Sequence, residues 1–417
     1  MSDLPNRLVG AIDSDRHWGQ LMRMGAIGSV EQTGVDRPCL SPGDREARRL
    51  LIGWAEAAGA TVSVDGAGNL WLRHEGTQPD AAAVLTGSHM DTQPRGGRFD
   101  GIWGVMAGLE VLSALHASNL RTARPIEVVA WTNEEGARFT PGCMGSMAWS
   151  GDTPLDRFAS VRDEAGISFG DALAEQLALE SDLPRRALGG RPHCYVEAHI
   201  EQGPLLEAAG QQIGVVTAIQ GSRWFTVTLD GASAHAGTAP VSMRRDAVQD
   251  AVRAITALNH LTHDPDDILR FTVGRIVVSP NSSNSVAGRV TFTIDLRHPD
   301  AATLTARGDA IADTVRAAVT STAATVTEVF HAMPIDFDAT VIDAVEQAAV
   351  ADGASYRRMP SGAFHDAQFV AGICPSGMLF VPCRDGISHN VAEYASPEHL
   401  ATGTRVLART LLALANG

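Results

Sequence analysis

The sequence has no apolar run that approaches the roughly 20 residues needed to cross a membrane, and its N-terminus lacks an apolar signal core. It also lacks an excess of basic residues, because 33 Lys and Arg stand against 48 Asp and Glu, a net charge of −15. Nucleic acids and anionic membranes require a basic surface. We therefore expect a protein that binds neither of them and carries no secretory leader.

Cysteine is scarce. The chain has 5 cysteines, an odd number, and no two of them form a CxxC pair. This pattern fits neither a disulfide framework nor a structural zinc site, so we interpret the cysteines as reduced, buried thiols of a cytoplasmic protein. At 417 residues, the chain is long enough for two or three domains.

Short apolar runs at 81–86, 126–132 and 194–199 alternate with helical stretches such as 104–117. Runs of this kind predict buried strands of a largely parallel α/β sheet. A capped helix at 41–59 and a hairpin at 62–73 are also predicted, together with a helix at 341–351 and a further buried strand at 377–381.

The pattern changes near residue 214. Alternating strands are predicted at 214–219, 224–229, 271–278, 289–295 and 325–330, with helices at 243–261 and 302–320. Such an order is typical of a self-contained α+β unit. We therefore predict a catalytic domain split between 1–213 and 331–417, with a second domain inserted at 214–330.

Residues able to bind metal follow the predicted strands, in the segments 88–91, 96–101, 133–136, 199–203 and 388–390. Each segment is weak evidence alone: a single His-x-Asp is more often an ordinary hydrogen-bonded pair, and Glu-Glu is usually a solvated surface. Together they supply three imidazoles and several carboxylates at strand ends. This set suits divalent zinc, manganese, cobalt or nickel.

Two metals require a bridging carboxylate, and Asp100 suits that role because glycines on both sides allow the backbone to bend around ions. The adjacent Glu134 and Glu135 point in different directions, so one can coordinate a metal while the other serves as general base. Asp91, two positions after His89, suits a role in orienting the imidazole.

The sequence resembles the amidase/carbamoylase branch of the M20 metallopeptidase superfamily. That branch includes N-carbamoyl-L-amino acid hydrolases, allantoate amidohydrolases and β-ureidopropionases. The matching segments, between Gly87 and Asn390, are GSHMDTQPRGGRFDGIWGV, TNEEGARF, HIEQGPLLE, ASAHAGTAP, NSVAGRVTFTIDLRH and ISHN. GGRFDG and HIEQGP are specific to this branch.

The resemblance implies an α/β fold: a mainly parallel-sheet di-metal catalytic domain with an inserted α+β, ferredoxin-like domain that acts as lid and dimerisation surface. It implies two divalent metal ions, with Zn²⁺ expected first and Mn²⁺, Co²⁺ or Ni²⁺ as alternatives. Glu134 matches the general base. The matching metal ligands are His89, Asp100 (as the bridge), Glu135, His199 and His389.

The inserted domain also contributes residues that match the family. His235 matches a histidine that the lid brings to the reacting carbonyl, often from the partner subunit of a homodimer. Asn284 and Arg297 match residues that hold the substrate carboxylate, and Gln202 matches a substrate-contacting glutamine.

One segment, 361–367, departs from the family pattern. Phe364 stands where the family usually has glycine, and its ring would narrow the pocket, shift the substrate range or simply pack nearby. The neighbouring His365 is assigned a contact with the substrate. No metal ligand is lost by this change.

The resemblance implies hydrolysis of an N-carbamoyl-L-amino acid, or of a related ureido acid such as allantoate, by a metal-bridged hydroxide with Glu134 as base. An N-acyl-amino-acid deacylase or dipeptidase on the same scaffold is the alternative enzyme. A non-enzymatic metal-binding protein or inactive regulatory subunit is the third alternative. Retention of Glu134 and His389 argues against that alternative.

Overall fold

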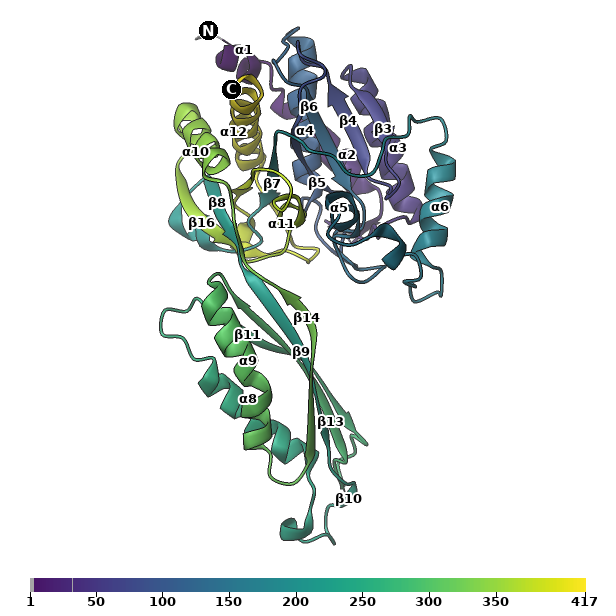
Figure 1. Cartoon of the computed structure of the whole chain (residues 1–417), viewed down its shortest axis with the longest axis vertical. Coiled ribbons are helices and arrows are strands. Elements are labelled where there is room, and N and C mark those ends of the chain that lie inside the picture. Colours follow the sequence, from purple (N-terminus) through teal and green to yellow (C-terminus); the bar gives the residue numbers. More distant parts are fainter. Residues whose placement is uncertain (1–3, 32) are drawn as a thin grey trace. The chain divides into compact units, whose positions relative to one another are not determined.

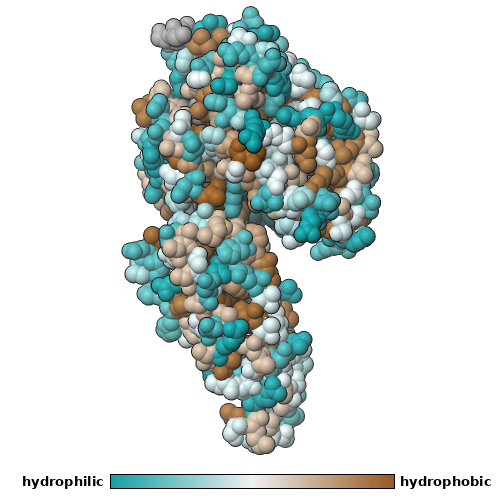
Figure 2. Space-filling view, in the orientation of Figure 1, coloured by the Kyte–Doolittle hydropathy of each residue, from teal (hydrophilic) through white to brown (hydrophobic). Residues whose placement is uncertain are grey.

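The computed structural model describes residues 4–31 and 33–417. The chain divides into two compact units (Figure 1). Unit 1 comprises Met1–Thr217 and Phe337–Gly417, and unit 2 comprises Ala218–Asp336. In the described part of the chain, no helix is long and apolar enough to cross a membrane. Figure 2 shows hydrophilic and hydrophobic residues interspersed over the visible face of both units.

A large mixed sheet forms the centre of unit 1. Its strands are β3 (Thr61–Val64), β4 (Leu70–His74), β5 (Val84–His89), β6 (Ile126–Trp131), β7 (Cys194–Ile200), β8 (Ile213–Ile219), β15 (Ile335–Asp336), β16 (Tyr356–Ser361) and β17 (Ser376–Val381). They are ordered β15-β8-β17-β7-β5-β6-β4-β3, and β16 pairs with β8. The inner strands β17, β7, β5 and β6 run parallel to one another. The predicted mainly parallel sheet is confirmed.

Helices pack around this sheet. They are α1 (Leu4–Gly10), α2 (Ser14–Ala26), α3 (Pro42–Ala57), α4 (Ile102–Ala117), α5 (Met144–Ser150), α6 (Phe169–Leu179), α7 (Leu205–Ala209), α10 (Ala339–Asp352), α11 (Ala367–Val370) and α12 (Pro397–Asn416). The side chain of Ser41 caps α3 by accepting from the backbone N–H of Asp44, as predicted from its capping residues. The apolar α4 is buried along most of its length and contacts β5, β7 and α12.

One strand belongs to a different sheet from the one predicted. We expected the strand at 214–219 in the inserted domain, but β8 pairs antiparallel with β17 in the sheet of unit 1. Its side chains are almost all buried, as in the parallel strands. A short buried strand shows its burial in the sequence but not its partner, because pairing depends on residues far away in the chain.

Unit 2 has the predicted ferredoxin-like order. It comprises β9 (Gly221–Asp230), α8 (Ala247–Leu261), β11 (Arg270–Ser279), β13 (Arg289–His298), α9 (Ala301–Ala318) and β14 (Ala323–Ala332). The sheet is ordered β11-β13-β9-β14, and every pairing is antiparallel. Alternate residues of β9 and β13 face a core shared with α8 and α9. A smaller pair, β10 (Ala234–His235) with β12 (Ser285–Val286), completes the unit.

Candidate metal centre and active site

The carboxyl ends of three neighbouring parallel strands carry the candidate site. His89 ends β5, His199 is the second-to-last residue of β7, and Glu134 and Glu135 follow β6. Because β7, β5 and β6 are adjacent and parallel, these ends meet at one edge of the sheet. Both histidines are almost completely buried, with 2% and 1% of their surface exposed. The predicted site residues of unit 1 therefore come together.

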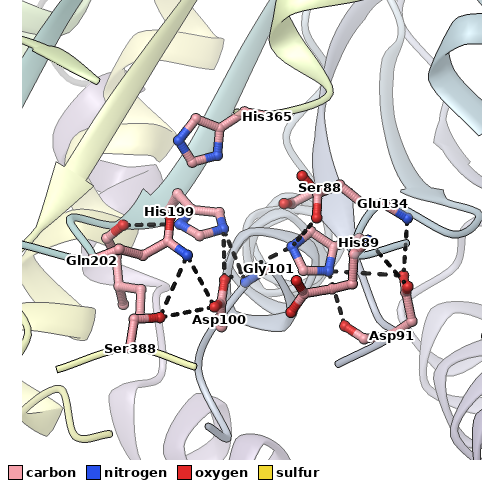
Figure 3. A network of polar contacts seen from close by, with 12 residues as sticks. Ser88, His89, Asp91, Asp100, Gly101, Glu134, His199, Gln202, His365 and Ser388 are labelled. Carbon is pink, nitrogen blue, oxygen red and sulfur yellow. Dashed lines mark hydrogen bonds and ion pairs between the residues drawn. The ribbon is translucent and has the colours of Figure 1, made fainter. Parts of the chain in front are cut away.

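Asp100 lies at the centre of this cluster (Figure 3). Its Oδ1 is 3.1 Å from His199 Nε2 and 3.8 Å from His89 Nε2. Its Oδ2 is 3.3 Å from His389 Nε2, and that nitrogen is 3.5 Å from Glu135 Oε2. Two groups of candidate ligands follow, His89–Asp100–His199 and Asp100–Glu135–His389, each with donor atoms within 4.8 Å of one another. Asp100 is the member that they share.

The two buried imidazoles are oriented by backbone carbonyls. His89 Nδ1 is 2.9 Å from the carbonyl oxygen of Asp91, and His199 Nδ1 is 2.8 Å from that of Ile200. A carbonyl only accepts hydrogen bonds, so each neutral ring carries its proton on Nδ1 and turns an Nε2 lone pair toward Asp100. That is the form in which histidine binds a metal.

The carboxyl groups of the site repel one another. Burial, followed by the charge of Asp100, raises the pKa of Glu135 to about 8. Burial and then Glu135 raise the pKa of Glu134 well above its usual value. Buried anions of this kind need compensating positive charge. Divalent cations bind mixed sets of imidazole and carboxylate ligands. The site offers such a set in its three imidazoles, Asp100 and Glu135, so its residues fit such ions.

Glycine allows Asp100 and His89 to approach closely. Gly101 has a φ of 64°, and a Cβ there would lie 2.2 Å from Cε1 of the His89 ring. A side chain at residue 101 would therefore displace His89 as well as strain the backbone.

After the end of β6, Asn133 has a φ of 58° and donates through Nδ2 to the carbonyl of Phe139, which turns the chain sharply at this point.

Glu134 and Asp91 lie beside the candidate ligands. Glu134 Oε2 is 3.4 Å from His89 Nε2, and Glu134 is in neither ligand group. The Asp91 carboxylate accepts the backbone N–H groups of Glu134 and Glu135, both at 3.3 Å. It lies 3.8 Å from His89 Nδ1, so the backbone carbonyl of Asp91, rather than the carboxylate that we expected, makes the short contact with the imidazole.

The two remaining predicted residues of unit 1 also reach the centre. Gln202 donates from Nε2 to Asp100 Oδ2 at 3.0 Å. His365 is buried, contacts the Ser361 hydroxyl at 2.9 Å and has its ring centroid 4.6 Å from that of His199. Figure 3 shows His365 beside the His199 ring. Phe364 is half-buried next to it.

Unit 2 carries the other three predicted residues, and it brings only two of them together. The backbone carbonyl of Asn284 accepts the backbone N–H of Ala236 at 2.9 Å, beside His235 at the β10–β12 pair. Arg297 lies near the end of β13, opposite Ser222 at the start of β9. His235 and Asn284 thus form one cluster in unit 2, and Arg297 belongs to the other end of its sheet.

Three residues that support the site were not predicted. Gln93 donates from Nε2 to Glu135 Oε2 at 2.8 Å, Ser388 donates to Asp100 Oδ2 at 2.9 Å, and Glu393 accepts the backbone N–H of Asp100 at 3.1 Å. Ser388 precedes the predicted ligand His389, which was a usable signal. Nothing in the local sequence marks Glu393, because its partners lie almost 300 residues away.

Comparison with known proteins identifies the family of the chain. Residues 85–413 match the model of Peptidase family M20/M25/M40, so the chain belongs to that family. It is 40% identical over 412 residues to an N-carbamoyl-L-amino acid amidohydrolase of Geobacillus stearothermophilus, covering 97% of this chain and 100% of that one. It is 36% identical to an allantoate amidohydrolase of Escherichia coli (strain K12), covering 94% of this chain and 96% of the relative.

A solved structure is similar throughout. The amidase of the hydantoinase/carbamoylase family from Burkholderia multivorans matches with a TM-score of 0.89 and 43% identity, covering 97% of this chain and 98% of that one. The predicted family and fold are confirmed. The predicted reaction class, an amidohydrolase that cleaves a carbon–nitrogen bond in a linear amide, is confirmed as well.

Proposed function

We propose that this amidohydrolase hydrolyses an N-carbamoyl-L-amino acid, or a closely related ureido acid such as allantoate. The observation that carries the proposal is the pair of ligand groups that share Asp100, with Glu134 beside them and in neither group. Relatives over the full length named for N-carbamoyl-L-amino acids and for allantoate support the substrate class.

One divalent cation would be held by His89, Asp100 and His199, and a second by Asp100, Glu135 and His389. When bound, such cations lower the pKa of coordinated water and polarise the scissile carbonyl. Zn²⁺ is the ion that we expect first, and Mn²⁺, Co²⁺ and Ni²⁺ suit the same mixed donors.

Glu134 would transfer the protons. Its carboxylate is held beside the centre, because Asp91 accepts the Glu134 backbone N–H and Glu134 Oε2 lies 3.4 Å from His89 Nε2. The carboxylate takes the proton of the attacking water and returns it to the leaving nitrogen. For a carbamoyl substrate, the products are the amino acid, carbon dioxide and ammonia.

His235 would donate a hydrogen bond to the oxyanion that develops on the carbonyl. Its Nδ1 accepts the backbone N–H groups of Gly237 at 3.1 Å and Thr238 at 3.2 Å. Because Nδ1 is an acceptor, the neutral ring carries its proton on Nε2, which makes Nε2–H the donor. In this proposal the histidine acts in the active site of the partner subunit.

Arg297 and Asn284 would bind the substrate carboxylate from different chains of the proposed homodimer, because they lie at opposite ends of the sheet of unit 2. Asn284 would act together with His235, and Arg297 would come from the other chain. Asp295 contacts Arg297 Nε at 3.0 Å and Nη2 at 2.8 Å, which sets the plane of the guanidinium. Ser282 donates to Asn284 Oδ1 at 2.9 Å, so the amide nitrogen is the end that can donate to an anion. Gln202 and His365 would contact the substrate near the metal centre.

We further propose a cytoplasmic homodimer formed through unit 2. All five cysteines are free and buried, which suits a reducing compartment. The edge strand β11 exposes the apolar side chains of Ile276 (53% exposed) and Val277 (44% exposed). An apolar edge of this kind is suited to pairing with a second copy of the chain.

The test is ammonia release by metal-reconstituted protein from N-carbamoyl-L-amino acids, N-carbamoyl-β-alanine and allantoate. N-acetyl-amino acids and a dipeptide are assayed in parallel by ninhydrin. Metal-dependent ammonia release from a ureido acid is the expected result. Cleavage of only the acyl or peptide compounds would assign the chain to the deacylase or dipeptidase alternative and make Phe364 the first residue to substitute.

A further inference from the structure

A buried carboxylate outside both ligand groups contacts the loop that carries Asp100. Glu393 is only 2% exposed. Its Oε1 accepts the backbone N–H groups of Phe99 at 2.9 Å and Asp100 at 3.1 Å, and its Oε2 is 3.1 Å from the Ser388 hydroxyl. The carboxylate thus joins the C-terminal segment of unit 1 to the Asp100 loop.

The loop is shaped to admit this carboxylate. A Cβ at Gly97 would lie 1.9 Å from Cδ and from Oε1 of Glu393, so only glycine leaves room for it. The next residue of the C-terminal segment, Tyr394, packs edge-on against Phe99, with ring centroids 6.2 Å apart. The two segments therefore contact each other through both polar and aromatic groups.

Ser388 extends the connection to the side chain of Asp100. Its hydroxyl lies 2.9 Å from Asp100 Oδ2 and 3.1 Å from Glu393 Oε2. A hydroxyl has one proton, so it donates to one carboxylate at a time. Ser388 can change from one acceptor to the other without leaving its position, because both carboxylates lie within hydrogen-bonding distance of its hydroxyl.

Contacts from Glu393 and Ser388 would hold the Asp100 loop in one conformation. Asp100 has to present one oxygen to each ligand group, and a rotation of its carboxylate would remove it from one of them. The flanking glycines at 96, 97 and 101 allow many backbone conformations, so the loop needs contacts from elsewhere to fix one.

We propose that Glu393 is a positioning residue of the metal centre: it fixes the backbone of the 97–101 loop so that the Asp100 carboxylate faces two cations at once. The proposal rests on the proposed function only in treating Asp100 as a shared ligand. Glu393 belongs to neither candidate ligand group. Its side chain contacts the backbone at Phe99 and Asp100 and the hydroxyl of Ser388, which in turn contacts Asp100.

The test measures metal binding without substrate. Metal-depleted wild-type protein, Glu393→Ala and Glu393→Gln are titrated with Co²⁺ in equilibrium dialysis, and bound metal is counted. Wild type should bind two ions per chain. Glu393→Ala should bind the weaker ion about 10- to 100-fold less tightly, the range for lost supporting contacts. Glu393→Gln should stay within about 3-fold of wild type, because its amide oxygen can accept the same two N–H groups.

Glu110→Ala is the matched control. Glu110 is a fully buried carboxylate of α4 that accepts the backbone N–H of Asp13 at 2.7 Å and pairs with Arg16, and it belongs to neither ligand group. Its loss should lower the melting temperature and leave the metal count at two. This separates a general loss of stability from a specific effect on the metal centre.

Several outcomes would overturn the inference. Wild-type affinity for both ions in Glu393→Ala would do so, as would equal losses in the Gln and Ala variants. If Glu393→Ala does not fold, Glu393→Asp decides, because its shorter arm cannot reach both N–H groups; unchanged affinity there refutes the role. A wild-type chain that binds fewer than two ions contradicts the shared-ligand assignment itself, and this failure is visible without any substitution.

Discussion

Replacing Glu134 by Gln separates proton transfer from metal binding. The two side chains have nearly the same shape, and Glu134 belongs to neither ligand group, so both groups keep all their donors. The amide can neither take a proton from water nor return it to the leaving nitrogen. We therefore expect two metal ions per chain in the variant, as in wild type, and a large loss of turnover.

The size of the loss follows from the role. A positioned general acid–base contributes about 10²- to 10⁴-fold to a rate. At ~1.4 kcal/mol for each factor of ten, this raises the barrier by about 3–6 kcal/mol. Because the substrate carboxylate still meets the same binding residues, KM should change by less than about 3-fold. Almost the whole loss of activity should therefore appear as a lower kcat for ammonia release.

The assay pairs ammonia release with metal analysis of the same samples. Glu135→Gln is the matched comparison, because it changes the neighbouring residue, which is a member of the Asp100–Glu135–His389 group. That variant should lose one ion. If Glu134→Gln loses an ion instead, Glu134 is a ligand and the assignment of the two glutamates is reversed. If it keeps more than about a tenth of the wild-type kcat, Glu134 is not the base.

Three further results are expected. Burial raises the pKa of Glu135 to about 8 and that of Asp91 to about 7, so the folded metal-free protein keeps protons that the unfolded chain releases near pH 4. The melting temperature of the metal-free protein should therefore decrease as the pH rises from 5 to 8. A melting temperature that is constant or increases over this range would contradict the charge balance of the site. Replacing His235 by Gln, which retains an N–H at about the reach of Nε2, should leave at least 10-fold more kcat than replacement by Asn, and equal rates would contradict donation from Nε2. Arg297→Ala should raise KM about 10- to 150-fold for carboxylate substrates, because hydrogen bonds to charged groups contribute ~1.5–3 kcal/mol, and unchanged kinetics would reject its role.

Much of the candidate metal centre could be predicted, because several of its candidate ligands follow strands that are recognisable in the sequence. His89 and His199 end apolar runs, and parallel strands bring such ends together whatever the intervening loops do. Asp100 and His389 lie in loops, where the sequence offers residue types but no positions. The family resemblance, rather than periodicity, assigned their roles.

Other features depend on distant partners and were missed for that reason. The burial of β8 was visible, but its pairing with β17 joins residues more than 160 positions apart. Glu393 resembles any surface glutamate in its local sequence, and only folding places it against Phe99 and Asp100. The separation of His235 from Arg297 within unit 2 likewise follows from strand pairing: His235 pairs with Ser285, before β13 begins, whereas Arg297 lies near the end of β13.

The position of unit 2 within the chain separates the two candidate ligand groups in the order of synthesis. Synthesis proceeds from the N-terminus, and His89, Asp100 and His199 all precede unit 2, so one complete ligand group leaves the ribosome early. The second candidate group is incomplete until His389, which follows unit 2, has been synthesised. A chain that ended after unit 2 would contain every residue of the first candidate ligand group but not His389 of the second. It would also lack β17, a central strand of the sheet, and Glu393, which contacts the Asp100 loop.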